Sequence, residues 1–438
     1  MAVKTGSNTG SVERLVGSYH AWATNGASRA PAWLKDLREG GIARFGDLGF
    51  PNMKQEAWRF TSVAPIAEGS FELAKPPVRI PQLEDMRPFL LFEAGYRLVF
   101  VDGFFQPSLS TPFFDDIQSL AHVVTHRQDL VRQHLGQYAA TQDRPFSALN
   151  TAFVSDGAFV HVPAKATIAE PIQLLFLSTG GKAAVTHPRN LVVLEREARA
   201  SIVETYASLS QGPYWTNSVT EVVVGEAARV DYYRVQRESP RAYHVGATQM
   251  HQGRDSTVNL HTVAFGAALA RHDIGAVMAG PGGRLILNGL YLLGAEQHAD
   301  HHTTIDHAAD HCESHEYFNG VLDGHSRGVF TGRIIVRPGA QKTDSKQTNN
   351  NLLLSADAHA DSQPQLEIYA DDVKCTHGST VGPLDPRALF YLRSRGIGEH
   401  EARRLMTYGF AAEIIGRMEV VALRAQLDSI VRGRLAEP

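Results

Sequence analysis

The chemistry that this sequence offers most directly is metal ligation by a cysteine and a histidine near its C-terminal end. Cys375 and His377 stand two residues apart within the segment 369–382. In an extended strand this spacing places both side chains on the same face. Sulfur and imidazole nitrogen together suit iron or zinc, and the adjacent Lys374 would help to lower the thiol pKa. The alternative interpretation is that Cys375 is a small buried hydrophobic residue, as a lone cysteine usually is.

A second candidate for metal binding is the histidine-rich stretch 298–325. On a helix, three of its histidines would share one face, and with the nearby Cys312 they could hold zinc or iron. The His-Glu-x-x-His pattern and paired-cysteine zinc patterns are absent. Histidines and acids also line the turns of β-solenoids for purely structural hydrogen bonding. The histidines are His298, His301, His302, His307, His311, His315 and His325, the three on one helical face being His307, His311 and His315.

Other catalytic signatures are missing from the sequence. It contains no Gly-x-x-x-x-Gly-Lys-Ser/Thr phosphate loop, no Gly-x-Ser-x-Gly nucleophile elbow and no dinucleotide-binding fingerprint in a βαβ setting. No catalytic signature in the sequence is therefore specific enough to name. The alternative function is a mononuclear metalloenzyme that uses the histidine-rich stretch 298–325.

Composition and charge describe an ordinary globular chain. Its 438 residues are 43% hydrophobic and 20% charged, with a net charge of -4. This balance gives no reason to expect nucleic acid or an anionic membrane as a partner. Two cysteines cannot build a disulfide framework, residues 1–8 lack a signal-peptide layout, and the apolar runs are too short to span a bilayer. We expect a soluble, cytoplasmic protein.

The elements that must position these residues fall into three regions. Residues 1–150 are mixed: 12–23, 32–37 and 118–136 predict helices, 98–103 predicts a strand, and 75–81 is a Pro-rich linker. The aromatic and charged segment 55–61 is typical of a packed junction. Residues 385–438 are helical, because Asp385 is an N-cap, Pro386 follows at the first helical position and Gly396 ends that helix.

Two apolar stripes run along the C-terminal helices. Packing within their own domain accounts for such stripes, although one of them could remain for a partner. The first stripe is Ala402, Met406, Phe410, Ile414 and Met418, widened by Leu405, and the second is Val420, Leu423, Leu427, Ile430 and Val431.

Residues 151–384 have the texture of a β-solenoid. Short runs of Val, Ile and Leu recur between turns, and 191–204 aligns with 221–234 at an offset of 30 residues. Repeated short strands without helices indicate coils that stack into one continuous core, as in a β-helix. A β-sandwich would give the same short strands, but hairpin dipeptides are sparse, with Asn319-Gly320 the clearest.

Several segments in order along the chain resemble the SufB/SufD family of iron–sulfur cluster assembly scaffolds. They are 55–61, 159–163, 187–190, 326–332, 347–355, 364–378, 389–397 and 408–410. The SufB branch typically carries a Glu-His-Glu-Ala-Thr-like segment where this chain has Val-Lys-Cys-Thr-His-Gly at 373–378, so the resemblance is to the SufD branch.

The resemblance implies a mainly β fold, a right-handed parallel β-helix (151–384) between an N-terminal helical or mixed region (1–150) and a small C-terminal helical domain (385–438). It implies a non-enzymatic scaffold subunit that pairs with a SufB-like paralogue along the β-helices and docks a SufC-like ABC-type ATPase on the C-terminal domain. A homodimer is possible when the chain is isolated. By the same resemblance, the ATPase-docking residues would be Phe390, Tyr391, Arg395, Gly396, Met406 and Phe410.

The resemblance also implies the cargo. A transient iron–sulfur cluster, or iron, would form at the interface with the paralogue, with His377 as the residue most implicated and Cys375 in a less settled role. None would be tightly bound to the isolated chain. Thiolates with an occasional imidazole are the ligands that iron–sulfur chemistry prefers. A β-helix carbohydrate-active enzyme is a further rival, but it would need paired acids, exposed aromatic residues and a secretion signal.

Overall fold

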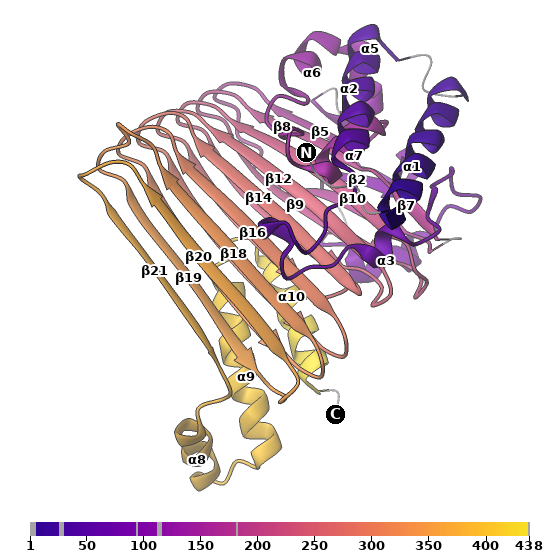
Figure 1. The fold of residues 1–438 in the computed structure, drawn as a ribbon. Coiled ribbons are helices and arrows are strands. Elements are labelled where there is room, and N and C mark those ends of the chain that lie inside the picture. Colours follow the sequence, from indigo (N-terminus) through magenta and orange to yellow (C-terminus); the bar gives the residue numbers. More distant parts are fainter. Residues whose placement is uncertain (1–5, 26–29, 93–94, 112–115, 181–182, 437–438) are drawn as a thin grey trace.

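The computed structural model describes residues 6–25, 30–92, 95–111, 116–180 and 183–436. The described chain is mainly β, a parallel β-solenoid of about eight turns with helices at its N-terminal end and along one side (Figure 1). This confirms the predicted β-helix and excludes the β-sandwich. Asn319-Gly320 lies inside a strand, not at a hairpin turn.

Each coil of the β-helix contributes one strand to each of two sheets, so that neighbours within a sheet are alternate strands along the chain. The first sheet, called sheet A here, contains β5 (Ala158–Val162), β8 (Arg189–Leu194), β10 (Trp215–Val224), β12 (Tyr243–Gln252), β14 (Leu269–Met278), β16 (His298–His307), β18 (Arg327–Val336) and β20 (His359–Ile368). Sheet B contains β6 (Ile172–Ser178), β9 (Arg199–Ser208), β11 (Arg229–Arg237), β13 (Thr257–Ala264), β15 (Arg284–Leu293), β17 (Glu313–Leu322), β19 (Asp344–Leu353) and β21 (Lys374–Gly382).

The parallel register confirms the repeat that the sequence predicted. Leu191 pairs with Glu221 in sheet A and Arg199 pairs with Arg229 in sheet B, both at the predicted offset of 30 residues. Later coils differ in length, since Tyr243 pairs with Leu269 while Arg327 pairs with His359. Alternate side chains point inward, and one continuous apolar core fills the solenoid from Leu98 to Ala370.

The corner from sheet A to sheet B recurs in successive coils with a residue of positive φ. The φ values of these corner residues lie between 52° and 72°, in the left-handed region of the backbone. This conformation lets the chain turn sharply between two strands. The corner residues are Glu197, Ala227, Asp255, Gly282, His311 and Lys342. His311 of the histidine-rich stretch is therefore a turn residue.

The N-terminal region covers the first coils. It contains α1 (Gly6–Asn25), α2 (Ala32–Leu48), η2 (Glu56–Trp58), α3 (Ala64–Ala67), β1 (Glu72–Leu73), α4 (Leu83–Met86), η3 (Arg87–Phe89), β2 (Arg97–Val101), β3 (Phe104–Phe105), η4 (Pro107–Leu109), β4 (Ile117–Ser119), α5 (Leu120–His126), α6 (Gln128–His134) and α7 (Pro145–Ala152), and β7 (Ala184–Thr186) pairs with β1. The predicted helices at 12–23 and 32–37 are confirmed and longer than expected. The predicted helix 118–136 is broken into a strand end and two short helices. Trp58, Phe146 and Trp215 join this region to sheet A through ring contacts.

The N-terminal region and the solenoid share a sheet, because β2 pairs in parallel with β6. The predicted boundary at residue 150 stays a prediction. In the described helices, none is long and apolar enough to cross a membrane.

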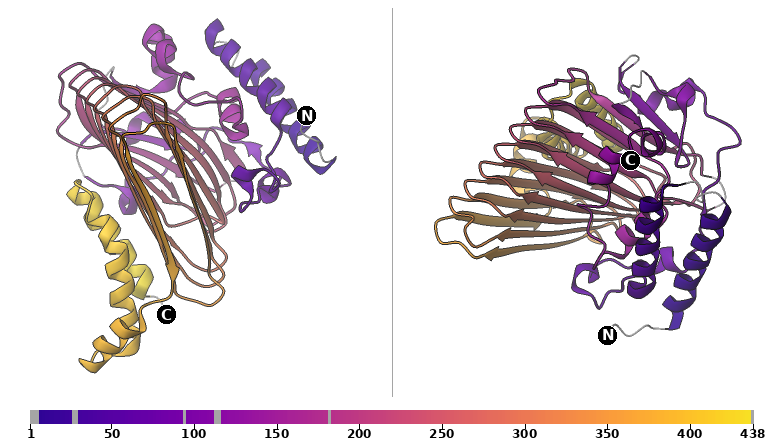
Figure 2. Two further views of the ribbon diagram at one scale, coloured as in Figure 1. Left: turned by 60° about the vertical axis from the view of Figure 1, so that its left-hand side comes forward. Right: turned by 90° about the horizontal axis from the view of Figure 1, so that it is seen from above.

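The C-terminal helices α9 (Glu399–Ile415) and α10 (Val421–Ala436) lie along the outer face of sheet B (Figure 2), whereas α8 (Pro386–Ser394) buries no residue and projects beyond the sheet (Figure 1). The Asp385 side chain accepts a hydrogen bond from the Arg387 N–H at 2.9 Å, which confirms the N-cap, and Gly396 follows α8 with φ 87°. Most of both predicted stripes is buried against sheet B, while Met406, Phe410 and Ile430 are half-buried and Leu405 is exposed. The stripes therefore pack mainly within this chain.

Candidate functional site

The open end of the β-helix, defined here as the last coil formed by β20 and β21, carries the cysteine and histidine. Cys375 is in register with Ser345 and His377 with Gln347, and both of these β19 residues are buried and face the interior. Cys375 and His377 therefore share the inward face of β21, as their spacing predicted. Figure 1 shows this coil at the far end of the solenoid from α1 and α2.

The two predicted ligands differ in exposure. Cys375 is half-buried and packs against the apolar core, whereas His377 is exposed at the end of the solenoid. Burial, together with the negative charge of Asp344, raises the pKa of the Cys375 thiol. The prediction that Lys374 lowers this pKa is wrong, because the pKa is raised and burial is the largest cause. The thiol would have to lose its proton before it could bind a metal.

The strands of the open end are the outermost members of their sheets. In the described chain no further strand pairs with β20 or β21. The Ser379 hydroxyl donates to the Ser362 hydroxyl at 2.8 Å and ties the two strands together across the interior. Ile368, Tyr369 and Val381 are exposed apolar side chains at this end. An edge of unpaired backbone beside exposed apolar groups is a surface that another chain can cover.

The histidine-rich stretch does not form a metal site in the described residues. The predicted helical face is wrong, because His307 ends β16, His311 lies in the following turn and His315 lies in β17. The Nε2 atom of His307 lies 2.8 Å from the Ser314 hydroxyl, and burial lowers the pKa of His307 to about 4. Among the described residues, no group of three or more His, Cys, Asp or Glu side chains could hold a metal ion.

The remaining histidines of the stretch are dispersed. His301 points into the core and its ring stacks on Tyr291 at 5.2 Å, while Nε2 of His298 lies 2.9 Å from the Thr61 hydroxyl. Burial lowers the pKa of the His302 side chain on the outer face of sheet A. His325 is exposed near Asp357. The strand period of two residues sends neighbouring histidines to opposite faces, which suits structural roles.

The predicted ATPase-docking residues separate into exposed and half-buried sets. Phe390 and Tyr391 of α8 have exposed fractions of 72% and 58%, and the Arg395 guanidinium lies 5.3 Å from the Tyr391 ring. Gly396 is exposed, whereas Met406 and Phe410 are half-buried in α9. The Phe410 carbonyl accepts a hydrogen bond from Asn319 of β17. Exposed aromatic residues on a short helix fit a contact surface.

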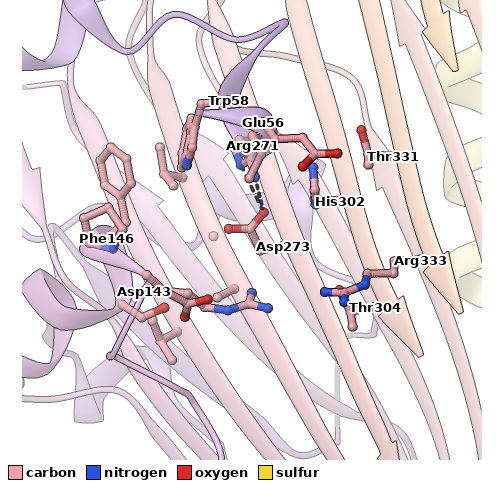
Figure 3. A pocket seen from close by; sticks show the side chains of 18 of the residues that line it. Glu56, Trp58, Asp143, Phe146, Arg271, Asp273, His302, Thr304, Thr331 and Arg333 are labelled. Carbon is pink, nitrogen blue, oxygen red and sulfur yellow. Dashed lines mark hydrogen bonds and ion pairs between the residues drawn. The ribbon is translucent and has the colours of Figure 1, made fainter. Parts of the chain in front are cut away.

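Sequence reasoning missed a polar groove at the junction of the N-terminal region and sheet A (Figure 3). It lies between the η2 segment, the start of α7 and the outer face of β14, β16 and β18. Arg271 is fully buried there, with its Nη1 atom 2.6 Å from Asp300 and its guanidinium 3.8 Å from the Trp58 ring. These contacts confirm the packed junction that segment 55–61 predicted, but the groove depends on residues far apart in sequence.

The fold and the open end define a β-helix protein with a potential ligand pair at an uncovered end, and comparisons with known proteins identify its family. The family model described as the SUF system FeS cluster assembly SufBD core domain matches residues 176–410, and the SufBD protein N-terminal region matches residues 11–174. The chain therefore belongs to the SufBD family of iron–sulfur cluster assembly proteins.

Curated relatives match almost the whole chain. An iron–sulfur cluster assembly SufBD family protein of Synechocystis is 34% identical, with 92% of this chain and 91% of the relative covered. The iron–sulfur cluster assembly protein SufD of Escherichia coli is 30% identical over 95% of this chain and 96% of its own length. SufD of Bacillus subtilis is 28% identical, with 92% of this chain and 94% of the relative covered. The resemblance to the SufD branch is confirmed.

Proposed function

We propose that this chain is a non-enzymatic scaffold subunit that presents His377 and Cys375 to a nascent iron–sulfur cluster. The observation that carries the proposal is the placement of both side chains on the inward face of an uncovered last coil. Iron in such clusters takes thiolate ligands with occasional imidazole. One cysteine and one histidine are too few for a complete site, so the remaining ligands come from a partner. The cluster is transient cargo, and the isolated chain holds none tightly.

The first proposed partner is a SufB-like paralogue that covers the open end. The unpaired edges of β20 and β21 and the exposed Tyr369 and Val381 support this contact. Pairing would bury the backbone edge and enclose His377 between two subunits. In such an enclosed site, a cluster would be protected from water during assembly. The complex would act in the cytoplasm, where a reducing environment keeps Cys312 and Cys375 free, as they are in this structure.

The second proposed partner is a SufC-like ABC-type ATPase on the C-terminal helices. Phe390 and Tyr391 support it, because they form an exposed aromatic pair next to Arg395. The SufC-like partner would provide the phosphate loop that this chain lacks. Association of two ATPase subunits on binding ATP would strain the C-terminal domains and expose the enclosed cluster site.

Replacement of His377 by Ala in the co-expressed complex tests the ligand role. We expect the complex to assemble normally, because the side chain is exposed, and to accumulate little iron and sulfide. The matched control is His359→Ala, which removes another exposed histidine of the open end from the neighbouring strand. Full cluster content in the His377→Ala complex would refute the ligand role.

The docking proposal needs a separate experiment. Phe390→Ala together with Tyr391→Ala should abolish co-purification of the ATPase but leave the paralogue bound. Val421→Ala is the control, since Val421 is a 66% exposed apolar residue on another C-terminal helix. Unchanged recovery of the ATPase with the double variant would place its docking surface elsewhere.

A further inference from the structure

Beneath His377, inward-facing polar side chains of sheet B form a column. Glu316 of β17 is in register with Gln347 of β19, and Gln347 is in register with His377 of β21. Equivalent side chains of adjacent strands stack about 4.8 Å apart. Glu316 and Gln347 are buried, with exposed fractions of 2% and 1%, so this column is the interior surface on which the His377 ring would rest.

The orientation of the Gln347 amide follows from its one hydrogen bond. Its Nε2 atom donates to Oε2 of Glu316 at 2.6 Å. A side-chain amide has a donor and an acceptor end, so this bond turns Oε1 away from Glu316 as a free acceptor. Oε1 is buried and has no hydrogen-bond partner in the described part of the chain. A buried carbonyl without a partner is costly, which indicates that a donor is expected there.

The surroundings hold this amide in place. A Cβ atom at Gly332 of the facing sheet would lie 2.2 Å from the Gln347 Nε2 atom, so the amide occupies space that this glycine leaves free. Glu316 is held between the strands as well, and burial raises its pKa to about 7, opposed by hydrogen bonds from Thr303 and Gln347. The acceptor of the column therefore lies on a buried strand of the solenoid and not in a loop.

The His377 ring is the donor that this arrangement lacks. His377 is exposed, and within the described residues its ring makes no hydrogen bond, so rotation of the side chain can bring it over Gln347. A histidine that binds a metal through one nitrogen usually donates its other N–H to a carbonyl or carboxylate. Such a bond fixes the tautomer and directs the free nitrogen toward the metal.

We infer that Gln347 is a positioning residue for His377: its Oε1 accepts one ring N–H and leaves the other nitrogen to face the partner subunit and the cluster. Glu316 fixes the amide in the orientation that makes this possible. The inference rests on the proposed function, in which His377 is a ligand. The contact between Gln347 and His377, however, can be measured without any cluster.

The test uses the full chain in complex with its paralogue, with histidine labelled with carbon-13 and with no iron present. The ring Cδ2 shift of His377, identified by its loss in the His377→Ala complex, reports the tautomer. We expect a single tautomer in the native complex and a shift toward the mixed-tautomer value in Gln347→Met, which retains the shape of the side chain but has no amide. Glu316→Leu, which frees the amide to turn, should move the shift in the same direction by less.

Asn349→Leu is the matched control, because Asn349 is an equally buried amide on the same face of β19 but lies in register with Ser379. It should leave the His377 shift unchanged. When iron is added, Gln347→Met should weaken occupancy by about 10- to 100-fold and Asn349→Leu should not. An unaltered His377 shift in Gln347→Met, or equal changes in Asn349→Leu, would overturn the inference. Full iron occupancy in His377→Ala would overturn only the ligand role of His377. The contact between Gln347 and His377 would still be decided by the Cδ2 shift of the His377 ring.

Discussion

The β-helix is covered at its first coils by the chain's own N-terminal region, whereas its last coil, β20 and β21, ends without a cover in the described chain. At the covered end, Phe50, Phe146 and Trp215 pack ring against ring over sheet A. At the open end, every residue of β21 is exposed or half-buried, including His377. Both ends have the same backbone, with strand edges that need a partner.

The covered end of the β-helix contributes to the stability of the chain, whereas the open end is left available for a partner. The covered end holds a buried charge among internal partners: the Glu221 carboxylate accepts hydrogen bonds from the Gly136, Tyr138 and Ala139 N–H groups and pairs with Arg189. The open end leaves an edge of nine or ten residues per strand. Pro364 within β20 has no N–H to offer, as is typical of an edge strand. An edge retained at this length is what an obligate partner would cover.

The largest effect should follow from breaking the covered end. Arg189→Met removes the cation that pairs with the fully buried Glu221 and leaves a buried carboxylate without a counter-charge. We expect a loss of about 3–5 kcal/mol in the free energy of unfolding, measured by urea denaturation. The matched control is Arg333→Met, which breaks the part-exposed pair with Glu367 near the open end and should cost about 0–1 kcal/mol. Equal losses would mean that the two ends do not differ in this respect.

The second prediction compares buried carboxyl groups near the two ends. Glu221 is paired with a cation, whereas Glu316 receives hydrogen bonds only from neutral groups, and burial raises its pKa from 4.5 to about 7. A raised carboxyl pKa stabilises the folded chain below pH 4.5, and this contribution is lost as the pH rises to about 7. The total is about 3 kcal/mol.

Urea unfolding of the wild type and of Glu316→Gln at pH 4.5 and pH 8 tests this difference. The wild type should lose about 3 kcal/mol more than the variant over that interval, because glutamine cannot ionise. Other titrating groups act on both proteins and cancel in the comparison. Parallel pH dependence in the two proteins would show that Glu316 keeps an ordinary pKa.

The fold could be predicted where the signal is local. The offset of 30 residues between 191–204 and 221–234 is the register of β8 with β10, because stacked coils of equal length repeat the same inward positions. The spacing of Cys375 and His377 likewise needed only the strand period. The signal weakens where coils change length, as between Tyr243 and Leu269, since a fixed offset then no longer aligns equivalent positions.

The candidate site could be predicted less completely, since parts of it depend on distant residues. The spacing of four residues between His307, His311 and His315 suggested that they share a face, which is true only on a helix. In the structure these residues span a strand, a turn and a second strand. The contact of Trp58 with Arg271 joins residues more than 200 positions apart, which no local pattern records. Gln347 beneath His377 becomes visible only once the coil length places 347 and 377 in register.

A smaller effect is expected where the open end meets the C-terminal helices. Asp385→Ala removes the acceptor that caps the first turn of α8, which should destabilise this helix by about 1 kcal/mol. Hydrogen exchange of the α8 amides is the measurement, and faster exchange should be confined to residues 386–394. The control is Asp371→Ala, which removes an exposed acid just before β21. This variant should leave the hydrogen exchange of the α8 amides unchanged. Acceleration across β20 and β21 would show that α8 and the open end unfold together.

The smallest effect on stability is expected from the residue that matters most to the proposed function. His377→Ala should alter the free energy of unfolding by less than about 0.5 kcal/mol, because the side chain is exposed and makes no hydrogen bond within the described residues. His301→Ala, by contrast, empties a fully enclosed position beside Tyr291 and should cost about 2–4 kcal/mol. Urea denaturation of both variants makes the comparison within one residue type. A large loss for His377→Ala would mean that the ring already makes a stabilising contact within the open end of the isolated chain.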